Sequence, residues 1–333
     1  MQIIAAEQSD HEIGPESDDR LKVGLAQMAP VWLNREASLA KVADAMRLAA
    51  EQNCQLLTFG EALVPGYPFW IDPTHGAHFN NAAQKEMYAL YLDQGVDIDR
   101  GDLADIATLA KSLKLAVYLG IMERAADRGG HSLYCSLVYI SEQGVIGSSH
   151  RKLQPTYEER LAWAQGDGHG LVTHPLSSFT LGGLNCWENW MPMARAALYG
   201  LGTDLHVSVW PGGMHNTPDI SRFIALESRS YVIACCGLLR AQDVPADVPM
   251  RDTIIANSGE WLGNGGSTVV APNGEVLIAP VAHTEALLTA VIDHAEVRKE
   301  RHNFDPSGHY SRPDVLQLQV DRRRQRTINT MDY

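Results

Sequence analysis

Residues 182–192 read Gly-Gly-Leu-Asn-Cys-Trp-Glu-Asn-Trp-Met-Pro. The apolar residues 179–184 predict a short strand that ends at the cysteine, and residues 193–199 predict a helix beyond the proline. Cys186 therefore stands at a strand-to-helix corner, where backbone N–H groups and the helix dipole favour a thiolate. We interpret Cys186 as a candidate catalytic nucleophile, on which other polar residues of the chain should converge.

Composition and charge narrow the class of protein. The 333 residues carry a formal net charge of −13, which argues against a nucleic-acid partner because such partners select a basic face. No apolar run reaches the roughly 18 residues of a membrane span, and the N-terminus lacks the apolar core of a secretory signal. Five cysteines, an odd number, fit a reducing compartment better than a disulfide framework. These features predict a cytoplasmic protein that binds neither nucleic acid nor membrane.

Two kinds of strand connection are predicted along the chain. Strands alternate with helices through residues 21–121 and again through 205–238. Hairpins with turns at 141–144 and 272–275 add antiparallel strands. This mixture predicts a layered α/β architecture with mixed sheets.

The division of the chain follows from the same pattern. No internal repeat or Ser/Gly-rich linker interrupts it, which predicts a single domain over residues 21–318. Residues 1–20 are acidic and predict a flexible leader, and residues 319–333 form a C-terminal tail. The arginine-rich run at 321–326 is interpreted as a solvated segment, with an intersubunit contact as the alternative.

A glutamate at another predicted strand end is suited to activate the thiol. Glu61 follows the apolar strand 55–59 and precedes the turn sequence Pro-Gly-Tyr-Pro at 65–68. Apolar surroundings raise the pKa of a carboxyl group, which suits it to general-base work. A glutamate on a surface loop is the alternative interpretation.

A lysine at a third strand end offers a positive charge. Lys152 follows the predicted strand 145–150 and is placed to stabilise a developing oxyanion. Glu159, seven residues later, is placed to pair with Lys152 and hold it. A lysine exposed to solvent is the alternative, because most lysines are solvated.

Aromatic residues near these strand ends are candidates for a pocket wall that binds an organic substrate. They are Tyr67, Trp163, Trp187 and Trp210, each of which core packing would also explain. The remaining cysteines, Cys54, Cys135, Cys235 and Cys236, are interpreted as buried packing residues. The chain lacks a phosphate loop, a His-Glu-x-x-His motif and a Gly-x-Ser-x-Gly elbow, so neither a metal nor a serine nucleophile is expected.

Three spaced motifs resemble those of the nitrilase (carbon–nitrogen hydrolase) superfamily. They are Phe59-Gly60-Glu61 with the turn at 65–68, the segment 151–160 from Arg151 to Arg160, and Asn185-Cys186-Trp187-Glu188-Asn189. The segments Gly166-Asp167-Gly168 and 308–314 are also similar to nitrilase segments. The resemblance covers residues 21–318, and the Cys-Trp-Glu-Asn form is similar to the nitrilase branch rather than the amidase branches.

The resemblance implies a four-layer α-β-β-α sandwich and a mechanism without metal or organic cofactor. Glu61 matches the family's general base, Lys152 its catalytic lysine, Cys186 its nucleophile and Glu159 a further glutamate of the site. The implied reaction converts a small organic nitrile to the carboxylic acid and ammonia through a thioimidate and a thioester. The resemblance also implies a homo-oligomer with a dimeric building block, and many nitrilases assemble further into spirals.

Two other functions stay open at this point. One is an amidase, or a cyanide- or nitrile-hydrating relative that releases the amide with the same residues. The other is an inactive assembly protein, whose signature would be the loss of Glu61, Lys152 or Cys186. All three residues are present, which favours an enzyme.

Overall fold

Two stacked sheets form the centre of the molecule in the computed structural model, which describes residues 1–6, 19–328 and 331. Along the first sheet the strands are β1 (Gln2–Ala5), β14 (Ala286–Asp293), β2 (Arg20–Gln27), β3 (Leu56–Phe59), β4 (Ala116–Arg124), β5 (Leu133–Ile140) and β6 (Ile146–Arg151). Along the second they are β11 (Leu238–Arg240), β12 (Trp261–Val270), β10 (Tyr231–Cys236), β9 (Leu205–Trp210), β8 (Phe179–Asn185) and β7 (His174–Leu176). Strand β13 (Val276–Ala282) pairs with β12. Both sheets mix parallel and antiparallel pairs, as the sequence predicts.

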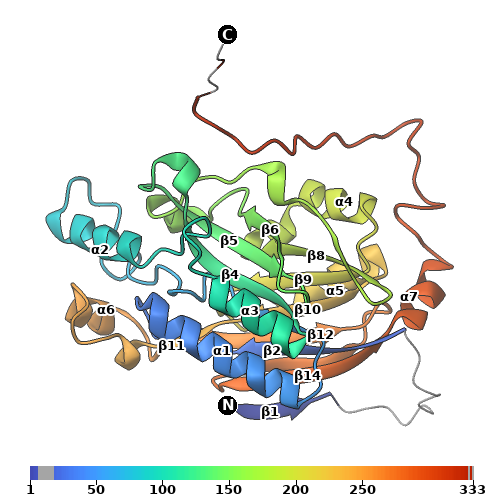
Figure 1. Ribbon diagram of the computed structural model, residues 1–333, viewed down its shortest axis with the longest axis horizontal. Helices are drawn as coiled ribbons and strands as arrows, with labels where there is room; N and C mark the ends of the chain where they lie inside the picture. The colour runs from blue at the N-terminus through green and yellow to red at the C-terminus, as the bar shows by residue number, and fades with distance from the viewer. Residues whose placement is uncertain (7–18, 329–330, 332–333) are drawn as a thin grey trace.

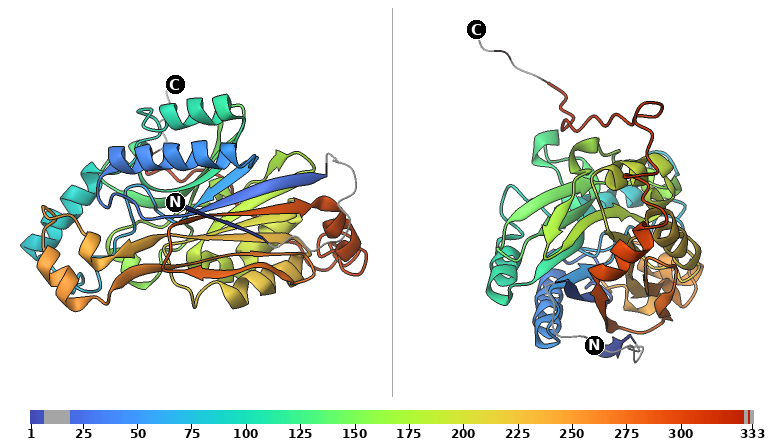
Figure 2. Two further views of the ribbon diagram at one scale, coloured as in Figure 1. Left: turned by 90° about the horizontal axis from the view of Figure 1, so that it is seen from below. Right: turned by 90° about the vertical axis from the view of Figure 1, so that its right-hand side faces the viewer.

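Helices cover the outer faces of both sheets (Figures 1 and 2). Helices α1 (Arg35–Glu51) and α3 (Ala104–Leu113) pack on the first sheet. Helices α4 (Pro192–Gly200) and α5 (Pro218–Ser228) pack on the second. The resulting order of layers is helix, sheet, sheet, helix, which confirms the four-layer α-β-β-α sandwich.

The apolar core between the sheets explains the unbroken apolar runs in the sequence. Leu25, Tyr118 and Leu137 of the first sheet share one buried cluster with Val207 and Ile233 of the second. Strands that are covered on both faces need apolar residues at every position rather than at alternate ones. Every residue of β9 and β10 is accordingly buried.

Local signals fix several helix ends. Helix α1 begins after Asn34, whose side-chain oxygen accepts a hydrogen bond of 3.0 Å from the N–H of Ala37. Pro218 occupies the first turn of α5, where its missing N–H costs nothing.

Three helices lack a sequence prediction, namely α2 (Ala82–Asp93), α6 (Arg251–Asn257) and α7 (His294–Arg301). They bury few side chains, only Val297 in the case of α7, so few of their residues mark a buried face in the sequence.

The two ends of the chain differ from their predictions. Residues Gln2–Ala5 form an edge strand that pairs in parallel with β14, so the predicted flexible leader does not describe them. Residues 7–18 of that leader lie outside the described residues, and its last residue, Arg20, begins β2. At the other end residues 321–326 are exposed, as predicted for a solvated run, with the exception of Arg324, whose guanidinium pairs with the buried carboxylate of Asp167 at 3.0 Å. Among the described residues no helix combines the length and apolarity that a membrane crossing requires.

Candidate active site

Four charged or nucleophilic side chains from separate segments meet at one point between the ends of the strands. Glu61 follows β3, Lys152 follows β6 directly, and Cys186 follows β8 directly. Glu159 lies in a short 3₁₀ turn, Tyr157–Leu161. All four are buried, with exposures of 1–3%. One acidic or sulfur atom of each of Glu61, Glu159 and Cys186 lies within 4.8 Å of the other two.

The ammonium group of Lys152 lies between two carboxylates. Its Nζ donates to Oε1 of Glu61 at 2.8 Å and to Oε2 of Glu159 at 2.7 Å. Glu159 is itself held by the hydroxyl of Tyr67 at 2.7 Å and by the N–H of Thr156 at 2.6 Å. These carboxylates therefore already hold a cation, and that cation is Lys152.

Burial and charge set the protonation of this cluster. Burial, only partly offset by the positive charge of Lys152, raises the pKa of Glu61 to about 7. For Lys152, burial acts to lower the pKa, but the charges of Glu61, Cys186 and Glu159 outweigh burial and raise the pKa well above its usual value. The site thus combines a permanent cation with a carboxyl group that exchanges its proton near neutral pH.

Cys186 occupies a strained corner of the backbone. Its φ of 48° lies in the left-handed region, which non-glycine residues seldom adopt. A 3₁₀ turn, Cys186–Trp190, begins at this residue, and helix α4 follows it from Pro192, which confirms the helix predicted over residues 193–199. The side-chain amide of Asn189 donates to the carbonyl oxygen of Cys186 at 2.8 Å and so stabilises the corner. This backbone conformation sets the position of the Cys186 side chain.

The Cys186 thiol is protonated at rest. Burial, followed by the negative charge of Glu61, raises the pKa of the Cys186 thiol well above its usual value. Lys152 and the backbone N–H of Trp187 act in the opposite direction. A thiol in this state is a weak nucleophile unless a neighbouring group accepts its proton, and Glu61 is a nearby carboxyl group with a pKa of about 7.

The seat of Glu61 is formed by both sheets. Its backbone N–H donates to the carbonyl oxygen of Trp210, at the end of β9, at 3.1 Å. Gly120 of β4 lies so close that a Cβ atom there would approach the carbonyl oxygen of Gly60 to 2.1 Å. Only glycine allows that contact. The backbone at Gly60 and Glu61 therefore packs between β4 of the first sheet and β9 of the second.

The predicted aromatic residues fall into two groups. Tyr67 and Trp163 lie beside the charged cluster, with their rings 5.4 Å apart and the Trp163 ring 5.8 Å from Nζ of Lys152. The Trp187 side chain is 49% exposed and packs against Trp190 instead. Trp210 is fully buried, and its indole N–H donates to Oγ of Ser208 at 2.7 Å. Tyr67 and Trp163 are therefore the two of the four that border the charged cluster with their side chains.

Cys135 also contacts the charged cluster, although the sequence did not identify it as a site residue. The Sγ of Cys135 donates to Oε1 of Glu61 at 3.4 Å, although Cys135 reads as an ordinary packing residue of an apolar strand. Its backbone carbonyl also accepts from the N–H of Lys152 at 2.8 Å. The strand pairing of β5 with β6 places it there, and a hairpin prediction combined with the lysine position is the signal that points to it.

The chain is similar to known proteins over most of its length. Residues 22–302 match the family model described as carbon-nitrogen hydrolase. The protein "Nitrilase 2" of an unknown prokaryotic organism is 37% identical over 90% of this chain and 92% of its own length. The "Aliphatic nitrilase" of Sinorhizobium fredii is 33% identical over 91% of this chain and 96% of its own. A carbon-nitrogen hydrolase from Helicobacter pylori has the same fold, with a TM-score of 0.62 and 20% identity over 89% of this chain and 96% of that one.

Replacing Lys152 with methionine should destabilise the protein in a pH-dependent way. The variant Lys152→Met leaves two buried carboxylates without a counter-charge, which costs about 3–5 kcal/mol at neutral pH. Loss of the cation raises the folded-state pKa of Glu61 further, so the cost disappears as the pH falls toward the unfolded-state value of 4.5. Urea unfolding at about pH 5 and about pH 8 measures this difference.

Lys41→Met is the matched control. Its ammonium pairs with Glu285 at 3.1 Å, but the lysine side chain is 35% exposed. A partly exposed pair of this kind contributes no more than about 1 kcal/mol, with little dependence on pH. Equal losses of stability in the two variants would contradict a buried, charge-compensating role for Lys152.

Proposed function

The chain belongs to the carbon–nitrogen hydrolase family, and from this premise we propose that it is a nitrilase, which hydrolyses an organic nitrile to the carboxylic acid and ammonia. The observation that carries the proposal is the buried contact of Lys152 with Glu61 and Glu159 beside the Cys186 thiol. The identity of 37% and 33% to two proteins named as nitrilases supports the choice of a nitrile over other carbon–nitrogen substrates.

The first half of the reaction forms a thioimidate. Glu61 accepts the proton of the Cys186 thiol, and the sulfur attacks the nitrile carbon. A new C–S bond forms, one π bond of the C≡N group breaks, and the nitrogen receives the proton from Glu61. The N–H of Trp187, which already acts on the thiol, and the ammonium of Lys152 stabilise negative charge at this stage.

The second half consumes two water molecules. Glu61 takes a proton from the first water, whose oxygen adds to the thioimidate carbon and gives a tetrahedral intermediate. Return of that proton to nitrogen gives an NH₂ group, and Glu61 then carries the remaining hydroxyl proton to the same nitrogen. The C–N bond breaks as the C=O bond forms, and ammonia leaves a thioester. A second water, activated in the same way, displaces the sulfur and releases the carboxylic acid. A carboxyl group with a pKa of about 7 serves equally well as acid and as base in these steps.

Lys152 and Glu159 have supporting parts in this scheme. Lys152 supplies a fixed positive charge for the tetrahedral intermediates, at a site where burial strengthens electrostatic interactions. Glu159 orients the ammonium group and is held in turn by Tyr67 and Thr156. We assign Tyr67 and Trp163 to the wall that faces the organic part of the substrate, because their rings border the charged cluster.

We also propose a cellular location and an oligomeric state for the enzyme. All five cysteines are free thiols, which supports a location in the reducing cytoplasm. A homo-oligomer built from dimers is supported by apolar side chains exposed around α4 and α5, where Trp190, Met193 and Phe223 are 41–63% exposed. Sedimentation velocity at micromolar concentration should give particles of two or more chains, and a monomer at every concentration would contradict pairing.

Replacing Cys186 with alanine should abolish turnover. The variant Cys186→Ala lacks the sulfur that forms the thioimidate, so ammonia release from a panel of aromatic, arylaceto- and aliphatic nitriles should fall to background in a folded protein. Cys54→Ala is the control, because Cys54 is buried on the outer side of the first sheet with α1 and should keep its activity. Normal turnover by Cys186→Ala would sink the assignment. Measuring acid against amide product from one nitrile separates a nitrilase from a hydrating relative.

The activity should follow the ionisation of Glu61. Because Glu61 acts as a base in its charged form, log kcat/KM should rise with a slope of about one below the pKa of about 7 and level off above it. The profile is measured with the uncharged nitrile that gives the highest rate, so that the substrate itself does not titrate. A plateau that extends unchanged to pH values near the ordinary glutamate pKa of 4.5 would contradict the assignment of Glu61.

A further inference from the structure

Glu188 is a buried carboxylate that no step of the proposed mechanism uses. Its exposure is 1%, and it makes hydrogen bonds with three different donors. Oε1 accepts from the backbone N–H of Leu153 at 2.8 Å, and Oε2 accepts from the backbone N–H of Asn185 at 3.0 Å. The Nε2 atom of His150 lies 2.9 Å from Oε2 and 3.0 Å from Oε1.

These donors belong to both sheets. His150 is in β6 of the first sheet, and Leu153 is the residue directly after Lys152. Asn185 is the last residue of β8 in the second sheet and directly precedes Cys186. One carboxylate therefore ties the backbone beside Lys152 to the backbone beside Cys186.

The electrostatics make this tie strong. A buried charge is costly unless every acceptor site finds a donor, and charge-assisted bonds are the strongest that a carboxylate makes. Burial acts to raise the pKa of Glu188, but His150 and the N–H groups of Asn185 and Leu153 outweigh it and leave the pKa lowered. Glu188 consequently stays charged across the pH range in which the reaction runs.

We propose that Glu188, supported by His150, is the positioning residue that sets the distance between the Lys152 ammonium and the Cys186 thiol. The proposal rests on the proposed function for the roles of Lys152 and Cys186. Glu188 acts through the backbone on either side of them and touches neither reacting atom. Displacement of reacting groups by about an ångström lowers rates by up to about 10²-fold, so a tie of this kind controls rate without contacting the substrate.

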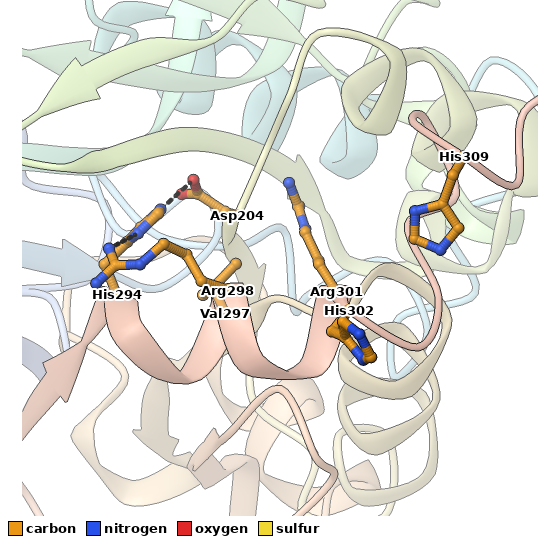
Figure 3. Close-up of a pocket in the computed structure, with 7 residues that line it drawn as sticks. All are labelled: Asp204, His294, Val297, Arg298, Arg301, His302 and His309. Atoms are coloured by element: carbon orange, nitrogen blue, oxygen red, sulfur yellow. Dashed lines mark hydrogen bonds and ion pairs between the residues drawn. The ribbon is translucent and has the colours of Figure 1, made fainter.

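The chain contains a matched carboxylate at the opposite end of the same strand. Asp204 accepts from the N–H of Thr180, near the start of β8, at 2.7 Å. It also lies 3.0 Å from Nε2 of His294, beside the pocket next to α7 that Figure 3 shows. Asp204 thus resembles Glu188, because it is a buried carboxylate bonded to a histidine and to a backbone N–H of β8. Thr180 and Asn185 are five residues apart, or about 16 Å along a strand, so this pair lies away from Cys186.

The test compares Glu188→Gln with Asp204→Asn in the full chain. A glutamine has one acceptor oxygen and one NH₂ group, so in Glu188→Gln one of the two backbone N–H groups faces another donor. We expect kcat for nitrile hydrolysis to fall at least about tenfold with KM changed by less than about threefold. In Asp204→Asn both constants should stay within about threefold of the wild type, even where the thermal midpoint falls equally in both variants.

A second readout does not depend on the substrate. The rate at which iodoacetamide alkylates Cys186, followed by mass spectrometry across pH, reports the thiolate fraction. The charge of Lys152 acts to lower the pKa of the Cys186 thiol. Because Glu188→Gln lets the two groups move apart, the alkylation midpoint should move to higher pH, whereas Asp204→Asn should leave it unchanged. The proposal would be overturned if Glu188→Gln and Asp204→Asn had the same kcat and KM and the same alkylation midpoint.

His150→Leu keeps the proposal testable where Glu188→Gln does not fold. It removes one of the three donors and leaves both backbone bonds, so the same changes should appear at a smaller size, about threefold in kcat. A midpoint and kcat no different from those of Asp204→Asn would overturn the proposal. Failure of the wild type to hydrolyse any nitrile would instead contradict the proposed function, and the alkylation comparison would still decide the role of Glu188.

Discussion

The ammonium group of Lys152, held between the carboxylates of Glu61 and Glu159, is the interaction on which the rest of the site depends. Three charged groups are buried there at exposures of 1–2%, a condition that costs free energy unless each charge is paired and hydrogen-bonded. The pairing is nearly complete, since Tyr67 and Thr156 also donate to Glu159. Burial, with a smaller contribution from the charge of Glu159, outweighs the effect of the cation and raises the pKa of Glu61 to about 7. The same arrangement therefore stabilises a buried cluster and holds a carboxyl group that ionises near neutral pH.

The sandwich supplies the geometry that makes such a cluster possible. Glu61 and Lys152 follow strands of the first sheet, and Cys186 follows a strand of the second. Neither sheet alone brings all three side chains together. The wide apolar core between the sheets keeps the strand ends in register, because close-packed interiors resist sliding. The apolar core and the buried charged cluster are thus two consequences of stacking the same strands.

The corner at Cys186 shows how the fold sustains local strain. A left-handed φ of 48° is unfavourable for a cysteine, and it persists because surrounding contacts determine it. Asn189 holds the carbonyl oxygen of Cys186, and Glu188 holds the N–H of Asn185 just before it. Two residues of the Cys-Trp-Glu-Asn segment, Glu188 and Asn189, thus bind the backbone on either side of the thiol.

The sequence by itself determined the family and the strands that lead into the site, but not helices α2, α6 and α7. Apolar runs and turn residues are local signals, so they located the strands that end before Glu61, Lys152 and Cys186, and the three motifs identified the family. Only the tertiary structure decided which side chains meet, because that depends on contacts between residues distant in the chain. Cys135 reads as packing and yet donates to Glu61, whereas Trp187 reads as a pocket wall and yet is half exposed. Likewise the sequence shows Glu188 only as part of a motif. The structure shows that its carboxylate accepts hydrogen bonds from the backbone N–H groups of Leu153 and Asn185, which the stacking of the two sheets brings together.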